Sequence, residues 1–296
     1  MLSCFMMNKK ILNNLCSPKR IIGVKAGIVQ AMPKISPDTK ITLDKWERIY
    51  RKSLNDQSYE LEKQEYDRKY LKDTLEQIFA DYQPQRDDVY LEIGCGPMFL
   101  GQELAKRGLK VIGIDFSLSA LIIAQKMFKK SKIKNYLLIR SDIQNIPLQN
   151  DTVDLIYGGG VIEHFKETDL VVSEMHRILK KGGVCINSVP QLNLGSLTYR
   201  QVWGNIPDFP VLKQIAELVH IKLLKKRYMR FGYELSFGKQ TIKKIFEKHG
   251  FSKVKVKKLK CVLSFEYLKF PWLKTIAQKL SKLEVFNPMI LIVAKK

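Results

Sequence analysis

Short apolar runs alternate with helical patterns through the middle of the chain. The apolar runs cover residues 89–93, 111–115, 136–140, 153–157 and 183–189, and the helical patterns cover residues 99–107, 117–130 and 169–180. Three of the runs, VYLEI, VIGID and VDLIY, are apolar nearly throughout, as is typical of strands that helices cover on both faces. Alternating strands and helices at this spacing predict βαβ units and a parallel sheet.

The segments on either side of this alternation have different patterns. Residues 43–82 carry a charged helical pattern that Pro84 ends, so we expect an N-terminal helical cap over residues 41–84. Residues 1–40 show no clear period, which predicts a mobile or loosely docked arm. A loop and a basic amphipathic helix around 208–227 predict an insert at about 191–237, within a domain of residues 85–296. A helix at 240–249 and strands at 252–260 and 288–294 complete this domain.

The charge of the chain is unevenly distributed. The 296 residues include 51 Lys and Arg against 29 Asp and Glu, a net charge of +22. Residues 200–296 contain 22 basic and 6 acidic residues and so carry +16 of that charge. Apolar residues make up 45% of the chain, which is enough for a sizeable core and excludes intrinsic disorder. The basic character therefore belongs to the last third of the chain.

The cysteines and the N-terminal residues indicate the cellular compartment that we expect for the protein. The five cysteines lie far apart, without a CxxC pair or a Cys/His cluster, so neither a disulfide framework nor a metal site is predicted. Near the N-terminus the charges follow the apolar patch, which is the reverse of a signal peptide. The longest uncharged stretch, residues 182–199, is too polar for a membrane span of about 20 apolar residues. We therefore expect a cytoplasmic protein without a transmembrane helix.

A glycine-containing turn follows the first predicted strand. Glu92 lies near the end of that strand, and Gly94 and Gly96 allow the backbone to turn tightly and to approach a ligand closely. The GxGxxG pattern of nicotinamide and flavin enzymes is not completed, so a nicotinamide oxidoreductase is the least favoured interpretation. Asp115 ends the second strand about 20 residues later, where a carboxylate can accept both hydroxyls of a ribose.

Residues 86–190 resemble a class I S-adenosylmethionine-dependent methyltransferase of the small-molecule type, similar to the ubiquinone and menaquinone biosynthesis methyltransferases. The resemblance rests on the glycine turn, Asp115, Asp142 after the third strand, and the segment 157–164 after the fourth, with a weaker match at 45–50. It implies a Rossmann-like α/β fold with helices on both faces of a mostly parallel sheet and an antiparallel last strand. The implied cofactor is S-adenosylmethionine.

The resemblance also assigns residues to this cofactor. Glu92, Gly94 and Gly96 would frame its methionine part, and Asp115 would hold the ribose. Asp142 would meet the adenine amino group, and residues 157–160 would close over the sulfonium. The full set of expected cofactor-binding residues is Glu92, Gly94, Gly96, Asp115, Phe116, Asp142, Ile143, Gly158 and Gly159.

One residue departs from the family pattern. Met98 stands where the family usually has glycine, and a bulky side chain there could narrow the cofactor pocket. This departure is the basis of an alternative interpretation, a scaffold that binds the cofactor without catalysing a reaction.

Methyl transfer needs few catalytic side chains, because the sulfonium already carries an activated methyl group and the enzyme works mainly by holding a nucleophile in line. His164 is the best candidate for a general base, since it follows the fourth strand and histidine can take a proton near neutral pH. The alternative is that His164 is a structural residue at the start of a helix, with its ring hydrogen-bonded to the backbone. Glu163 could orient His164 or cap the next helix.

The basic last third of the chain does not identify the acceptor of the methyl group. Segment 211–230 has an apolar set and cations on its other faces, which suits either an anionic membrane surface or a lid over the substrate pocket. We expect methyl transfer to an O, N or C nucleophile of a small or lipid-linked molecule, with peripheral contact to an anionic membrane as an option. An RNA or protein methyltransferase is the alternative. Nucleic acid is the less favoured partner, because no Asn/Asp-Pro-Pro-aromatic motif follows the fourth strand.

Overall fold

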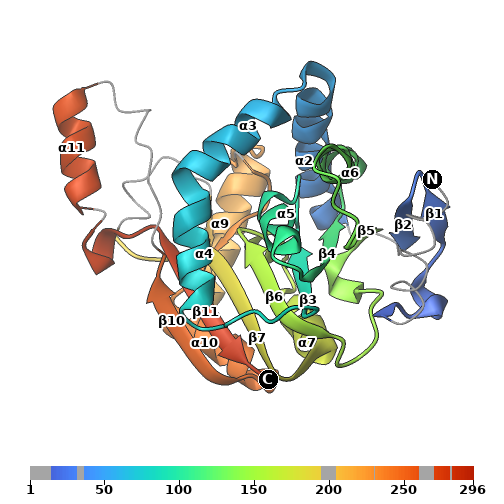
Figure 1. The fold of residues 1–296 in the computed structure, drawn as a ribbon. Helices are drawn as coiled ribbons and strands as arrows, with labels where there is room; N and C mark the ends of the chain where they lie inside the picture. The colour runs from blue at the N-terminus through green and yellow to red at the C-terminus, as the bar shows by residue number, and fades with distance from the viewer. Residues whose placement is uncertain (1–14, 32–36, 195–204, 230, 260–269, 281) are drawn as a thin grey trace.

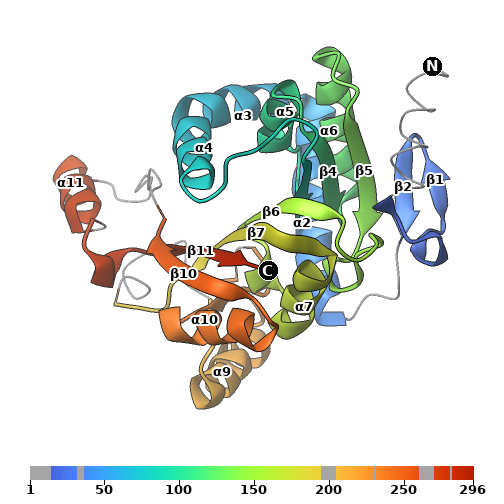
Figure 2. The same ribbon diagram turned by 60° about the horizontal axis from the view of Figure 1, so that its bottom comes forward.

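A single large sheet lies at the centre of the molecule (Figures 1 and 2). The structure, a computed structural model, describes residues 15–31, 37–194, 205–229, 231–259, 270–280 and 282–296. Within these residues the sheet has nine strands in the order β1-β2-β5-β4-β3-β6-β7-β11-β10. Its central strands are β3 (Val89–Ile93), β4 (Lys110–Asp115), β5 (Tyr136–Ser141), β6 (Val153–Gly159) and β7 (Leu179–Pro190).

The direction of the strands confirms the predicted fold. Strands β3 to β7 pair in parallel, whereas β11 (Met289–Lys295) runs antiparallel to β7 and β10 (Ser252–Lys258) runs antiparallel to β11. All five residues of β3 are buried, which explains why VYLEI is apolar nearly throughout. The sheet is therefore mostly parallel with an antiparallel end, as the Rossmann-like resemblance implied.

Helices cover both faces of the sheet, as Figure 2 shows. On one face α4 (Lys72–Phe79), α5 (Phe99–Lys106) and α6 (Leu118–Lys130) contribute Leu75, Leu104 and Phe128 to a core with Tyr90. On the other face α7 (Thr168–Ile178) and α10 (Lys239–Lys248) pack on the alternate residues of the same strands. The two faces thus divide the buried residues of each strand by the two-residue period of a β-strand.

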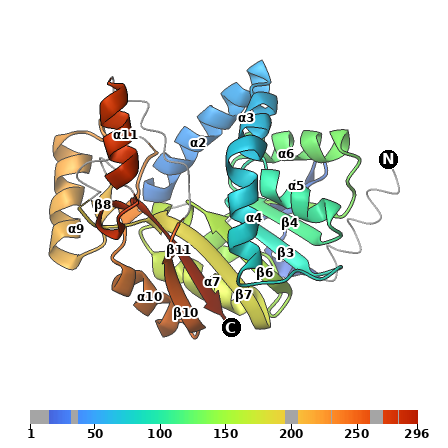
Figure 3. The same ribbon diagram turned by 60° about the vertical axis from the view of Figure 1, so that its left-hand side comes forward.

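The N-terminal helices cross the ends of the strands before they reach the sheet face (Figures 1 and 3). They are α2 (Pro37–Asp56), α3 (Tyr59–Tyr66), a π-helical turn at Asp67–Leu71, and α4. Glu47 of α2 accepts hydrogen bonds from the hydroxyls of Ser117 and Ser119, each at 2.7 Å. Because Ser117 is the N-cap of α6, the carboxylate of Glu47 lies at the positive end of that helix and ties α2 to it.

Residues 15–31, part of the arm that the sequence predicted to be mobile or loosely docked, join the edge of the sheet before α2. A 3-10 turn at Pro18–Arg20 leads to β1 (Gly23–Lys25) and β2 (Ile28–Ala31), and β2 pairs in parallel with β5. Arg20 forms an ion pair with Glu174 at 3.0 Å, and Ile28 is fully buried. Strands of three and four residues are too short to show a period in the sequence. Residues 1–14 and 32–36 of the predicted arm lie outside the described residues.

The segment after β7 forms a small unit beside the sheet. Strands β8 (Ile206–Pro207) and β9 (Leu235–Ser236) pair in parallel, and between them α9 (Pro210–Glu217) continues as a π-helical turn at Leu218–Leu223. Beyond β10, α11 (Pro271–Leu280) projects from the side of the molecule, and a 3-10 turn at Glu284–Phe286 precedes β11 (Figure 3). Residues 195–204 and 230 of the predicted insert lie outside the described residues.

No helix in the described part of the chain is both long and apolar enough to cross a bilayer.

Candidate active site

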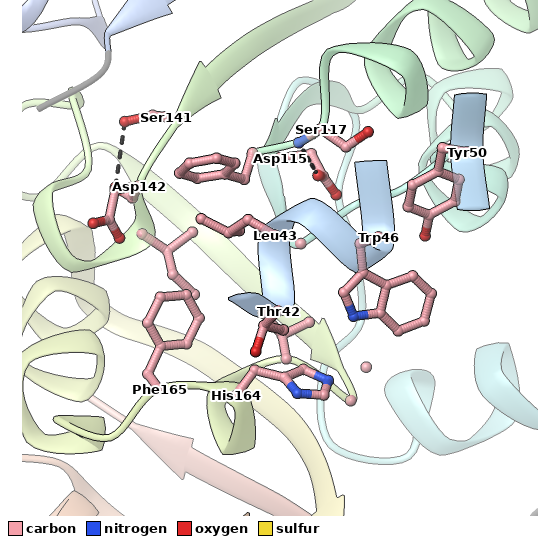
Figure 4. A pocket seen from close by; sticks show the side chains of 16 residues that line it. Thr42, Leu43, Trp46, Tyr50, Asp115, Ser117, Ser141, Asp142, His164 and Phe165 are labelled. Carbon is pink, nitrogen blue, oxygen red and sulfur yellow. Dashed lines mark hydrogen bonds between the residues drawn. The ribbon is translucent and has the colours of Figure 1, made fainter. Parts of the chain in front are cut away.

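A cavity of about 140 Å³ lies between α2 and the carboxyl ends of β3, β4, β5 and β6 (Figure 4). Its roof is formed by α2, through Thr42, Leu43, Trp46 and Tyr50. Its floor is formed by the loops that follow the four strands, through Gly94, Asp115, Phe116, Ser117, Ser141, Asp142, Ile143, Gly159, Gly160, Val161, His164 and Phe165. In open α/β sheets, ligands bind in a crevice at this edge.

The glycine turn after β3 adopts a conformation that side chains rarely allow. Gly94 and Gly96 have φ angles of +54° and +50°. A Cβ atom on Gly94 would lie 2.6 Å from Val161, and one on Gly96 would lie 2.6 Å from the hydroxyl of Tyr50. The turn therefore needs glycine both for its backbone and for the close approach of its neighbours.

Asp115 links the glycine turn to the start of α6. Its carboxylate accepts hydrogen bonds from the backbone N–H of Gly96 at 2.8 Å and of Ser117 at 2.7 Å. Burial raises the pKa of Asp115 to about 6, so the side chain is mostly ionised at pH 7. Each carboxylate oxygen has a further lone pair, and Asp115 is part of the cavity floor. It can therefore accept hydrogen bonds from hydroxyl groups of a ligand.

Three of the predicted cofactor residues do not line the cavity: Glu92, Gly96 and Gly158. Glu92 accepts hydrogen bonds from the hydroxyl of Tyr90 at 3.1 Å and the N–H of Gly101 at 3.0 Å, and burial raises its pKa to about 8. A Cβ on Gly158 would lie 2.4 Å from the side-chain oxygen of Asn187, so this glycine faces β7. These residues support the floor from behind.

Met98 lies in the core rather than in the cavity, so the expectation that it narrows the cofactor pocket is wrong. Its backbone is left-handed, with φ +56°, and its side chain is fully buried. A Cβ on Gly113 would lie 2.6 Å from the Met98 sulfur, and a Cβ on Gly101 would lie 2.5 Å from its methyl group. Two glycines therefore make room for Met98 between β4 and α5, and its side chain does not line the cavity.

Asp142 follows β5 on the opposite side of the floor from Tyr50 (Figure 4). Its side chain accepts a hydrogen bond from the N–H of Gln144 at 2.9 Å and so caps a 3-10 turn that begins with Ile143. Burial raises the pKa of Asp142. Arg140 donates to the carbonyl of Phe116 at 3.1 Å, which fixes the loop after β4 beside it.

His164 has one ring nitrogen engaged and the other available. Its Nδ1 lies 2.7 Å from the carbonyl oxygen of Tyr233, and because a carbonyl only accepts, Nδ1 carries the proton. Nε2 is then left with its lone pair. Burial lowers the pKa of His164 to about 4, so the ring is neutral at physiological pH. The ring also lies edge-on to Trp46, with centroids 6.2 Å apart.

Glu163 neither orients His164 nor caps α7, contrary to the prediction. It is 2% exposed, and its Oε2 has no hydrogen-bond partner among the described residues. The N-cap position of α7 is Glu167. Burial raises the pKa of Glu163 well above its ordinary value, and Glu234 raises it further. Burial therefore favours the protonated form of the Glu163 carboxyl group.

The roof contains residues that the sequence indicated only through the weak match at 45–50. Trp46 stacks on Tyr50 with ring centroids 5.7 Å apart and on Phe231 at 5.6 Å. Phe231 comes from the segment after α9, so no spacing in the sequence relates it to Trp46. Trp46 and Tyr50 thus line the cavity, and Phe231 stacks on Trp46 beside it.

Among the residues that the structure describes, no group of three or more His, Cys, Asp or Glu side chains is placed to hold a metal ion.

Comparison with known proteins identifies the family. A family model described as a methyltransferase domain matches residues 84–250, which is more than half of the chain. The chain belongs to the class I S-adenosylmethionine-dependent methyltransferases. The expected family, whose cofactor is S-adenosylmethionine, is thus confirmed.

Relatives of this methyltransferase differ in their substrates. It is 29% identical over 139 residues to a malonyl-[acyl-carrier protein] O-methyltransferase of Hamiltonella defensa, covering 47% of this chain and 51% of the relative. It is 28% identical over 202 residues to a demethylmenaquinone methyltransferase of Alkalihalophilus pseudofirmus, covering 63% of this chain and 78% of the relative.

A solved structure shares the fold of this methyltransferase. It is a phosphoethanolamine N-methyltransferase of Haemonchus contortus, with a TM-score of 0.54 and 18% identity. The similarity covers 77% of this chain and 52% of the worm enzyme. The chain thus spans about half the length of that enzyme and of the malonyl-[acyl-carrier protein] relative.

Proposed function

We propose that this methyltransferase transfers a methyl group from S-adenosylmethionine to an O, N or C nucleophile of a small or lipid-linked molecule. The observation that carries the proposal is the cavity between α2 and the strand ends. One floor brings together the carboxylates of Asp115 and Asp142 and the neutral imidazole of His164.

The floor fits a nucleoside. Asp115 would accept hydrogen bonds from the ribose hydroxyls, because its carboxylate is ionised near pH 7 and keeps free lone pairs. Phe116 and Ile143 supply apolar surface for a flat ring, and Asp142 would accept from the adenine amino group. The fit rests on these two carboxylate acceptors and two apolar side chains, which all lie on the floor of the cavity.

The glycine turn would hold the methionine part of the cofactor. Gly94 lines the cavity, and the backbone of Gly96 is fixed by its hydrogen bond to Asp115. Gly159, the last residue of β6, and Gly160 after it complete the same edge. Glu92 and Gly158 would act from behind, since neither of them reaches the cavity.

The bound cofactor supplies an activated methyl group on its sulfonium. The chain holds the acceptor nucleophile in line and excludes water, for which the stack of Trp46, Tyr50 and Phe231 is suited. Nε2 of His164 would take the proton from an acceptor hydroxyl or amine, because Nδ1 is already protonated. Burial keeps the ring neutral at pH 7, and the lowered pKa of about 4 also makes Nε2 a weaker base than an ordinary histidine, contrary to the expectation that His164 takes a proton near neutral pH.

The acceptor side of the cavity is largely apolar, which favours an acceptor with an apolar or aromatic part. Trp46 and Val161 line the cavity with His164, and we assign this part to the acceptor. The names of the relatives point to acceptors that are lipid quinones or carrier-linked acids, and both classes fit a small or lipid-linked acceptor. The alternative of an inactive scaffold has lost its basis, because Met98 lies outside the cavity.

The test is a turnover assay with methyl-labelled S-adenosylmethionine and acceptors from three classes: quinone precursors, acyl-carrier-linked acids and lipid amines. We expect labelled product with one class and formation of S-adenosylhomocysteine in equal amount. The matched control is the His164→Gln variant with the same acceptor. Methylation of added RNA or of a protein, with none of any small or lipid-linked acceptor, would contradict the proposal.

A further inference from the structure

Helix α9 and its π-helical continuation carry apolar residues on two sides. Ala216 and Ile221 pack against the core of the molecule. On the outer side, Val211, Ile215 and Leu218 follow the i, i+4, i+7 spacing of one helix face, and they are 63%, 53% and 48% exposed. The outer face therefore does not cover the core, as a lid packed by that face would require.

Helix α11 has a similar outer face. Trp272, Ile276 and Leu280 follow one another at four-residue spacing and are 61%, 46% and 38% exposed. None of the described residues of this helix is buried. Both α9 and α11 lie at the left of the view in Figure 3, whereas Figures 1 and 2 show them apart, with α11 projecting beyond the sheet. Contiguous exposed apolar residues of this kind mark interaction surfaces.

Cations flank both apolar faces. Lys222, Lys225 and Arg227 follow α9 and are exposed, and within the described residues none of them has an acidic partner. Glu217 is the acidic residue of α9, and its carboxylate is taken up by the hydroxyl of Tyr233 at 2.8 Å and by Lys166 at 3.6 Å.

Helix α11 repeats this charge pattern. It contributes Lys274 and Lys279 and contains no acidic residue between positions 271 and 280. Both outer faces thus combine exposed apolar side chains with positive charge that the described chain does not neutralise.

We propose that α9 with its π-helical turn, together with α11, docks on an anionic phospholipid membrane. The two outer faces, called here the docking surface, consist of Val211, Ile215 and Leu218 with Lys222, Lys225 and Arg227, and of Trp272, Ile276 and Leu280 with Lys274 and Lys279. Amphipathic helices of this composition lie in the membrane interface, with apolar side chains among the acyl chains and cations at the headgroups. An RNA partner would satisfy the cations but would leave the aliphatic side chains exposed.

The docking surface is joined to the roof of the cavity. The chain that leaves the π-helical turn passes Met229, whose carbonyl accepts a hydrogen bond from Lys45 of α2. It then reaches Phe231, which stacks on Trp46. Membrane contact would thus bring the roof close to the headgroups, where a lipid-linked acceptor could enter. This link to the acceptor rests on the proposed function, whereas the docking itself does not.

The test is flotation of the full chain with vesicles. Vesicles of phosphatidylglycerol and phosphatidylcholine are compared with vesicles of phosphatidylcholine alone at about 0.1 M salt. We expect flotation with the anionic vesicles only. Changing Lys222, Lys225 and Arg227 together to Gln should lower the partition coefficient about 100-fold, because each cation near such a surface is worth about 1 kcal/mol, or about fivefold. Ile215→Asp should lower it at least about tenfold.

Matched controls show whether the effect is specific to the docking surface or would follow from changing any exposed apolar residue or any exposed cation. Leu170→Asp changes an apolar residue of α7 that is 52% exposed, and Lys126→Gln with Lys134→Gln removes two exposed cations from another region. These controls should float like the parent protein. Circular dichroism of every variant shows whether it is folded.

Four results would overturn the proposal. They are absence of flotation, flotation that Ile215→Asp does not change, a dimer in sedimentation that Ile215→Asp dissociates, and binding to an oligonucleotide that depends on the cations but not on Ile215. Turnover of a water-soluble acceptor without vesicles is measured on the same preparations. A protein that turns over but does not float refutes the docking alone, and one that floats but does not turn over refutes the proposed function alone.

Discussion

The floor of the cavity is held by hydrogen bonds from backbone N–H groups to carboxylates, whereas the roof is held by contacts between side chains. Asp115 receives the N–H groups of Gly96 and Ser117, and Asp142 receives that of Gln144. Across the cavity, α2 is attached through Glu47 and through the stacking of Trp46. The floor therefore presents fixed acceptors for a constant ligand, and the roof is the part that can vary with the acceptor.

The attachment of the roof determines how the cofactor can enter the cavity. The cavity of about 140 Å³ is smaller than the roughly 300–1,000 Å³ of typical ligand sites. The roof contacts most easily separated are the two serine hydroxyls on Glu47 and the aromatic stack, because neither belongs to the sheet. Binding should thus move α2 and leave the floor in place.

The largest expected effect comes from His164, the floor residue that we propose as the general base. His164→Ala should slow turnover by about 10²- to 10⁴-fold, the usual contribution of a general base, and leave the affinity for S-adenosylhomocysteine unchanged. Because burial lowers the pKa of His164 to about 4, the parent enzyme should show no loss of activity near pH 6.5 at saturating cofactor. The matched control is His249→Ala, which removes a ring nitrogen 2.9 Å from the carboxylate of Asp169. Equal rates for His164→Ala and the parent would make His164 a structural residue.

Asp115 tests the cofactor side of the floor. Asp115→Ala should weaken binding of S-adenosylhomocysteine by about 1–3 kcal/mol, the range for leaving polar groups unpaired. Calorimetry measures this directly, and Asp151→Asn, which changes an exposed carboxylate paired with Lys296, should have no effect. An unchanged affinity in Asp115→Ala would show that Asp115 does not bind the ribose.

The pH dependence of binding sharpens the same assignment. Burial raises the pKa of Asp115 from its ordinary 3.8 to about 6, so the contribution of this group to folding stability is present below about pH 4 and is lost as the pH rises through about 6. Hydroxyl donors need the ionised form, so the affinity for S-adenosylhomocysteine should increase about tenfold from pH 5 to pH 7. Affinity that falls over this range would place the ionised carboxylate outside the binding site.

The smallest expected effect concerns the attachment of the roof. Glu47→Gln should lower the free energy of unfolding by about 0.5–2 kcal/mol, because the carboxylate accepts from two hydroxyls at the N-terminus of α6. Thermal unfolding measures the change. Glu60→Gln removes an exposed ion pair with Lys130 and should cost less than about 1 kcal/mol. An equal loss in both variants would show that Glu47 has no special part in holding α2.

Sequence patterns predicted the floor better than the roof, for physical reasons. Buried parallel strands are apolar throughout, so β3, β4 and β6 and the residues at their ends could be located from composition alone. The roof depends on contacts between distant segments, such as Trp46 with Phe231, which leave no period in the sequence. The tautomer of His164 likewise depends on a carbonyl 69 residues away.

The direction of the Met98 side chain also could not be predicted from the sequence. Met98 could enter the cavity or the core from the same place in the turn, and only the room provided by Gly101 and Gly113 directs it inward. Strands β1 and β2 were missed because three and four residues are too few to show alternation. Their place beside β5 depends on burial of Ile28 and on the ion pair of Arg20, which are both tertiary contacts.

The most direct test of the floor as a nucleoside site is calorimetric titration of the full chain with S-adenosylhomocysteine, with NADH as the parallel ligand. Micromolar binding of S-adenosylhomocysteine, no binding of NADH and a loss of affinity in Asp115→Ala are the predicted results. Binding of NADH in place of S-adenosylhomocysteine, or no binding of either ligand by the folded chain, would contradict the account.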